Sequence, residues 1–125
     1  MARMEPSAPV FDVKQLDKLS VLQDEKDPHV VEDLARSFLS RTPDRMLRMR
    51  EMLAAGEAGR LASEAHGLAS SSGMFGMMRM RQQCKELENL VRSGGLATAG
   101  ELLTEVEREY ERARPLLVAH LGLQD

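Results

Sequence analysis

The chain has 125 residues, 42% of them hydrophobic and 30% charged, which is typical of one globular domain with a single core. A net charge of -3 and an aromatic content of 3% argue against a nucleic-acid-binding protein, which would carry a basic surface and stacking aromatic rings. The single cysteine, Cys84, excludes an intramolecular disulfide and favours a reducing compartment. No apolar run reaches the roughly 18 residues that span a membrane, and no signal-peptide pattern is present. We therefore expect a cytoplasmic protein that binds neither nucleic acid nor membranes.

The N-terminal residues predict a disordered arm followed by a short helix. Residues 1–10 include two prolines and a serine, and we assign residues 11–125 to one folded domain. Asp12 can cap the first turn of a helix whose apolar side includes Leu16 and Leu19.

Four longer helical segments follow, separated by glycine and proline. Asp27 and Pro28 form a helix start, and the segment runs to about residue 55, with Pro43 either kinking it or beginning a new helix. The next two segments cover about residues 57–72 and 77–93. Thr98 and Glu101 make a capping box for the last helix, and Pro115 should kink it or end it early.

This order of elements predicts an all-α fold. Short turns place successive helices antiparallel, so we expect an up-down-up-down four-helix bundle with a short additional N-terminal helix.

His66 is the strongest candidate for chemistry because small residues surround it. On a helical wheel it falls about 140° from the buried Leu61, on the shoulder that meets solvent. The residues beside it on this shoulder, or next to it in the chain, are small: Gly59, Ser63, Gly67 and Ser70. Glycine destabilises a helix by about 1 kcal/mol relative to alanine, so these glycines suggest that another surface approaches the ring closely.

The following helix carries a largely basic line along one shoulder. Arg81, Lys85, Glu88 and Arg92 fall on the same side of the helical wheel, next to the apolar stripe that contains Leu87. If this shoulder faces His66, it would attract a phosphoryl group or an acidic partner. An ordinary solvated face is an equally good interpretation of these charges.

The residues around His66 resemble those of the histidine-containing phosphotransfer (HPt) domain of bacterial phosphorelays. The family pattern is approximately A-H-x-L-K-G-S-S-x-x-x-G, followed by a Cys and an L-E pair. The matching positions in this chain are Ala65, His66, Leu68, Ser71, Ser72, Gly76, Cys84, Leu87 and Glu88.

The resemblance implies a four-helix bundle with His66 exposed midway along one helix. It implies that His66 takes a phosphoryl group from the aspartate of one receiver domain and passes it to another. By this resemblance the chain is a phosphoryl carrier rather than an independent enzyme. We expect a monomer without a cofactor, since the receiver supplies Mg²⁺. Receivers should dock over His66, using apolar residues of the N-terminal helix such as Leu19 and Leu22.

The sequence departs from the family pattern at three positions. Ala69 stands where the family usually has Lys, Ser70 where it has Gly, and Glu88 where it often has Gln. A carboxylate at position 88 can hold the imidazole ring but would repel a bound phosphate. We expect that three cations partly replace the missing Lys: Arg81, Lys85 and Arg92.

Two alternative functions stay open. The chain can be a degenerate module of the same fold that binds and regulates a receiver or kinase without carrying phosphate, as the missing Lys suggests. It can also be a plain helical adaptor, in which His66 has no role. His29 and His120 are read as surface or capping residues, and no metal-ligand spacing is found.

Overall fold

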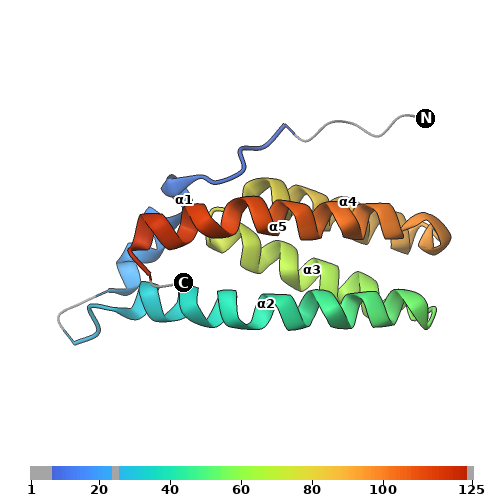
Figure 1. The fold of residues 1–125 in the computed structure, drawn as a ribbon, viewed down its shortest axis with the longest axis horizontal. Helices are drawn as coiled ribbons and strands as arrows, with labels where there is room; N and C mark the ends of the chain where they lie inside the picture. Colours follow the sequence, from blue (N-terminus) through green and yellow to red (C-terminus); the bar gives the residue numbers. More distant parts are fainter. Residues whose placement is uncertain (1–6, 24–25, 124–125) are drawn as a thin grey trace.

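The computed structural model describes residues 7–23 and 26–123, and every regular element in these ranges is helical, which confirms the all-α class. Four long helices lie side by side, and a short helix lies at one end of them (Figure 1). None of the described helices is both long and apolar enough to cross a membrane. The elements in chain order are α1 (Val13–Leu19), the 3₁₀ turn η1 (Ser20–Leu22), α2 (Val30–Ala54), α3 (Ala58–Met74), α4 (Met78–Arg92), the 3₁₀ turn η2 (Leu96–Thr98) and α5 (Gly100–Leu121).

The helices enclose one apolar core. Helix α4 packs against both α3 and α5, and α2 also contacts α3 and α5. Three of the chain's four aromatic rings meet inside, with Phe38 stacked on Phe75 at 4.9 Å and edge-on to Tyr110 at 6.4 Å between ring centroids. Their contacts join α2, α5 and the turn after α3, and so fix the end of the molecule where α1 also lies.

Pro43 lies inside α2 without ending it. Proline has no N–H, so the carbonyl of Leu39, four residues earlier, lacks its usual helical donor. The Tyr110 hydroxyl of α5 donates to this carbonyl at 3.2 Å. Of the two expected outcomes, the new helix start at Pro43 is therefore wrong: α2 is one continuous helix, and a side chain supplies the missing hydrogen bond.

Two expected helix starts are wrong. Helix α2 begins at Val30 with His29 as its N-cap, rather than at Asp27 and Pro28. The Thr98 hydroxyl donates to the Gly95 carbonyl in a 3₁₀ turn instead of capping the last helix. At Pro115, which was expected to kink the last helix or end it early, the early end is excluded because α5 continues to Leu121.

The segment before α1 is bound to the start of α4. Arg79 donates two hydrogen bonds to this segment. Its amide donates to the Pro9 carbonyl at 3.0 Å, and its Nε donates to the Ala8 carbonyl at 2.8 Å. The Ala8 amide donates to Gln82 Oε1 at 3.1 Å. Ala8 and Pro9, which we expected in a disordered arm, thus cap the N-terminus of α4, whereas residues 1–6 of that arm lie outside the described residues.

Asp12 caps α1 as predicted and also ties it to the α3–α4 turn. Its carboxylate accepts from the Lys14 amide at 3.0 Å, while its own amide donates to the Gly76 carbonyl at 2.8 Å. Gly76 has a φ of +79°, and a Cβ there would lie 2.5 Å from the Asp12 carbonyl oxygen. Only glycine allows this close approach, which positions α1 beside α3 and α4.

Candidate functional site

His66 projects from the middle of α3 into solvent. Its side chain is 68% exposed, as the helical wheel predicted. Buried residues such as Ala65 and Leu68 hold the helix against the core, while the ring itself lies outside. The Nδ1 atom is 3.1 Å from Oε1 of Glu88, which reaches across from α4. The imidazole is therefore anchored on one nitrogen and accessible elsewhere.

Glu88 is held between two partners. Its Oε2 accepts from Arg92 Nε at 2.8 Å, and its side chain is only 14% exposed. The hydrogen bond from Arg92 lowers the pKa of the Glu88 carboxyl, and the bond to His66 lowers it further, against the effect of desolvation. Glu88 is thus ionised at neutral pH and can only accept hydrogen bonds.

The charge on Glu88 determines which nitrogen of His66 carries the proton. Because a carboxylate only accepts, the Nδ1 atom of a neutral His66 must be the protonated one. Its Nε2 then carries the lone pair, and within the described part of the chain no hydrogen bond occupies Nε2. A neutral imidazole with a free, exposed nitrogen is a nucleophile.

The small residues around His66 differ in what covers them. A Cβ added at Gly59 would meet nothing within 4 Å, and Ser63 is exposed. A Cβ at Gly67 would instead lie 2.8 Å from Nη2 of Arg45, a residue of α2. Arg45 also pairs with Glu64, at 3.3 Å between Nε and Oε2. Gly67 therefore makes room for an arginine of the same chain, which sequence reasoning missed because nothing local marks this long-range contact.

Two of the three positions that depart from the family pattern, Ala69 and Ser70, lie on different sides of α3. Ser70 is exposed one turn after His66, and its hydroxyl is 3.4 Å from the His66 carbonyl. Ala69 is only 3% exposed and belongs to the core. The small side chain of Ser70 leaves the approach to His66 open, whereas Ala69 offers no charge there.

The three cations of the basic line on α4 lie in different surroundings. Arg92 binds Glu88 next to His66. Lys85 is exposed, and Arg81 lies along α3 at Gly73, where a Cβ would be 2.7 Å from Arg81 Cδ. Within the described ranges neither Lys85 nor Arg81 makes an ion pair. The structure therefore brings Glu88 and Arg92 to the histidine and places Arg81 about two helical turns away along α3.

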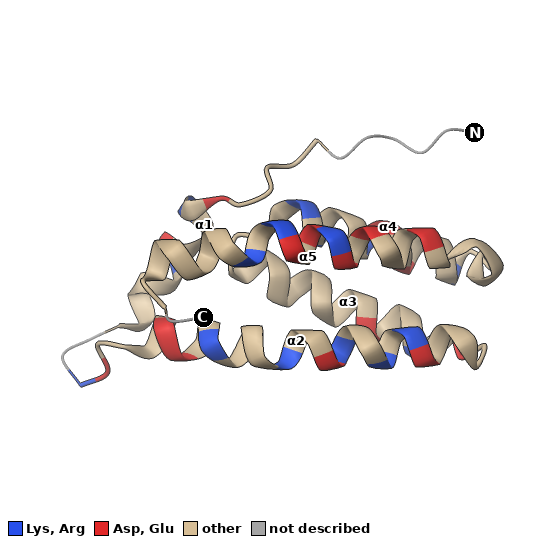
Figure 2. Cartoon of the chain, in the orientation of Figure 1, with Lys and Arg blue, Asp and Glu red and all other residues tan. Residues whose placement is uncertain are grey.

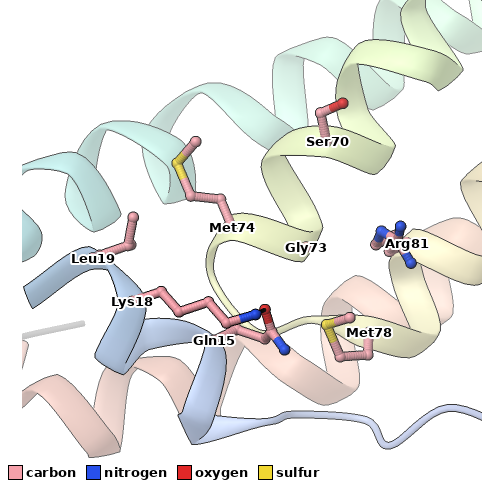
Figure 3. A pocket seen from close by; sticks show the side chains of 8 residues that line it. All are labelled: Gln15, Lys18, Leu19, Ser70, Gly73, Met74, Met78 and Arg81. Atoms are coloured by element: carbon pink, nitrogen blue, oxygen red, sulfur yellow. Dashed lines mark hydrogen bonds between the residues drawn. The ribbon is translucent and has the colours of Figure 1, made fainter.

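Two surface hollows lie to either side of His66 along α3. The first has a volume of about 460 Å³ and lies between α1, α3 and α4; we call it the α1 groove. The second, of about 330 Å³, is lined by small residues of α3 with Val91 and Arg92. Leu19 lines the α1 groove, whereas Leu22 lies outside its lining and is 51% exposed. Figure 3 shows the residues around the α1 groove: Gln15, Lys18, Leu19, Ser70, Gly73, Met74, Met78 and Arg81.

Other kinds of chemistry find little support. Burial raises the pKa of the Cys84 thiol to about 12, so this cysteine is a neutral core side chain. Among the described residues, no cluster of three or more histidine, cysteine or carboxylate side chains is arranged to hold a metal ion.

Helix α3 carries few charges, whereas α4 and α5 carry many of both signs (Figure 2).

Comparison with known proteins gives a family and a structural relative. A sequence model of the Hpt domain matches residues 33–115, which include His66, its partner Glu88, and Arg92, which binds Glu88. The crystal structure of histidine-containing phosphotransfer protein B (HptB) from Pseudomonas aeruginosa PAO1 is similar, with a TM-score of 0.80 and 29% sequence identity. The match covers 93% of this chain and 97% of that chain. A comparison with curated protein sequences gives no significant match.

Proposed function

The chain belongs to the Hpt domain family, whose role is histidine phosphotransfer in phosphorelays, and we propose that it relays a phosphoryl group between receiver-domain aspartates through His66. One observation carries this proposal: the ring of His66 is 68% exposed, and its Nδ1 is tied to an ionised carboxylate. A side chain kept outside the core with one nitrogen free is suited to meet a reacting group on another protein.

The transfer step uses the free nitrogen. The Nε2 lone pair attacks the phosphorus of the aspartyl phosphate, and a P–N bond forms as the P–O bond to aspartate breaks. The electron pair of that bond leaves with the aspartate carboxylate. Glu88 keeps the Nδ1 proton hydrogen-bonded and balances the positive charge that the ring develops. Transfer to the next receiver is the same step in reverse.

This protein and the receiver each supply part of the positive charge that stabilises the phosphoryl group. Arg92, next to the ring through Glu88, and the exposed Lys85 supply positive charge in place of the lysine that Ala69 replaces. We propose that the receiver brings Mg²⁺ and most of the groups that stabilise the moving phosphoryl group. The protein then acts as a cytoplasmic carrier without a resident cofactor, rather than as an independent enzyme.

The docking surface we propose includes the apolar residues of the N-terminal helix and turn. Leu19 packs partly against the core and lines the α1 groove, and Leu22 is 51% exposed. An approaching receiver would bury both beside His66. We also propose that the four long helices form an up-down-up-down antiparallel bundle, which the short α2–α3 and α3–α4 connections support.

The test of the proposed function is a relay between two receivers. The protein is incubated with a phosphorylated receiver, isolated, and mixed with a second, unphosphorylated receiver. We expect an acid-labile label on the protein that appears on the second receiver, and no label on the His66→Gln variant. A label that survives in His66→Gln would contradict the proposal.

Ala69 favours a second candidate, a module that binds a receiver or kinase without carrying phosphate. Its side chain is uncharged and buried, so the position that is usually Lys in the family carries no cation here. This candidate predicts that a phosphorylated receiver binds the protein while the wild-type chain stays unlabelled. Binding and labelling measured on the same sample separate the two functions.

A further inference from the structure

The α1 groove combines an apolar lining with two cations. Leu19, Met74 and Met78 contribute the apolar side chains, while Lys18 of α1 and Arg81 of α4 carry the charges (Figure 3). No acidic residue lines the groove. Two cations that face one hollow without an acid among its lining residues create a local positive potential in a chain whose net charge is -3.

The contacts of the two cations leave their charges uncompensated. Lys18 Nζ donates to the neutral Gln15 Oε1 at 3.2 Å, and no ion pair of either cation exists in the parts of the chain that the structure describes. Gly73 determines the course of Arg81, because a Cβ at this position would lie 2.7 Å from Arg81 Cδ and would displace the side chain. The arginine is thus directed along the groove by packing rather than by an acidic partner.

The position of the groove separates it from the transfer site. Ser70 at its near edge is four residues from His66, and Gly73 is seven residues away, which correspond to about 6 and 10 Å along a helix. Arg92 is linked to the His66 ring through Glu88, whereas Arg81 and Lys18 line the groove farther along α3. Arg81 and Lys18 are placed to contact a second group on the molecule that docks at His66.

The lining indicates which group that is. A free inorganic anion would gain nothing from Leu19, Met74 and Met78, whereas a side chain with an aliphatic stem and a carboxylate would use both parts of the groove. We propose that the α1 groove binds an acidic side chain of the docking receiver, a glutamate or aspartate next to an apolar residue, and that Lys18 and Arg81 thereby select among receivers. This inference rests on the proposed phosphotransfer function.

The experiment compares the receiver with a small phosphoryl donor. Receiver domains of the source organism are phosphorylated with acetyl phosphate, and the KM of the receiver that transfers fastest is measured for Lys18→Glu, Arg81→Glu and the charge-removing Lys18→Met and Arg81→Met. Labelling by phosphoramidate is measured for each variant in parallel. Lys14→Glu is the matched control, since Lys14 is exposed on the same helix and does not line the groove.

We expect each charge reversal to raise the receiver KM about tenfold and each methionine variant about threefold, because these cations act on encounter and docking. These changes should exceed any change in the phosphoramidate rate, and rising ionic strength should weaken wild-type docking more than that of the variants. Lys14→Glu should behave as wild type. Circular dichroism confirms that each variant is folded.

The outcomes separate this inference from the proposed function. Wild-type KM values in all four groove variants would overturn the acidic contact while leaving phosphotransfer intact. An equal loss with receiver and phosphoramidate would also overturn it, because Arg81 or Lys18 would then act on the phosphoryl group itself. Absence of label on wild-type His66 from either donor would instead refute the proposed function.

Discussion

Glu88 links the orientation of His66 to its reactivity. The carboxylate accepts from Nδ1 at 3.1 Å, and Arg92 at 2.8 Å holds the carboxylate in place and lowers its pKa. Sequence reasoning predicted the exposure of His66 from helical spacing, and it predicted that Glu88 can hold the ring. It did not find Arg45, because the contact of Arg45 with Gly67 depends on how α2 packs against α3.

Replacement of Glu88 tests its control of the tautomer. In Glu88→Leu the acceptor is lost, so Nδ1 should no longer be the protonated nitrogen in most neutral molecules, and phosphotransfer should slow by about 10–100-fold. Glu88→Gln keeps an amide oxygen at this position and should restore much of the rate. Long-range ¹H–¹⁵N NMR spectra of His66 report the tautomer directly. An unchanged tautomer in Glu88→Leu would contradict this role.

At the scale of elements, two prolines in long helices account for one expected new start and one expected early end that the structure does not have. Pro43 and Pro115 suggest kinks or ends when local rules are applied alone, yet both lie inside continuous helices. For Pro43 the structure provides the reason, since Tyr110 satisfies the Leu39 carbonyl from a helix 71 positions away in the chain. A contact of this range has no local pattern, so the sequence predicts the helix but not its continuity.

The contact between Tyr110 and Leu39 makes a measurable prediction. Tyr110→Phe should lower the free energy of unfolding by about 1 kcal/mol, because the Leu39 carbonyl loses its donor. In a Pro43→Ala background the restored amide can donate to the same carbonyl, so the cost of Tyr110→Phe should shrink. Urea unfolding of the wild type, the two single variants and the double variant gives the coupling energy between positions 43 and 110. Equal costs in both backgrounds would show that the hydroxyl does not replace the amide.

Two glycines in or next to α3 should respond oppositely to alanine. Gly59 has open space around it, so Gly59→Ala should stabilise the isolated protein by roughly 0.5 kcal/mol. Gly76→Ala should destabilise it by about 1–3 kcal/mol, because of its positive φ and the Asp12 carbonyl. Thermal unfolding checks both. Slower transfer from a receiver in the stabilised Gly59→Ala variant would support the predicted close approach at this position, and wild-type transfer would contradict it.

At the scale of the whole molecule, α1 is tied down at one end of α3, and His66 lies in the middle of α3. The segment from Ala8 to Asp12 joins the start of α4 and the α3–α4 turn, and so holds α1 at one end of the long helices (Figure 1), where α1 shares the α1 groove with α3. The sequence predicted the helical class and the small N-terminal helix from periodicity and from the Asp12 cap. It did not predict this attachment, because the hydrogen bonds join residues that are more than 60 positions apart in the chain and have no local pattern.

Docking over His66 predicts that apolar residues of the N-terminal helix and turn matter to receivers. Leu22→Asp should weaken receiver binding about tenfold, since its exposed side chain would be buried in the complex. Leu47→Asp is the matched control, because Leu47 is 60% exposed on α2 and lies outside the α1 groove. Isothermal titration with a receiver compares them. Equal binding by both variants would place the docking surface elsewhere.

Phosphorus NMR of the labelled protein shows most directly whether Nε2 of His66 receives the phosphoryl group. After transfer from a phosphorylated receiver, we predict a single phosphohistidine signal whose coupling to ¹⁵N assigns it to Nε2, and no such signal from His66→Gln. A signal assigned to Nδ1, to another residue, or persisting in His66→Gln would contradict the account.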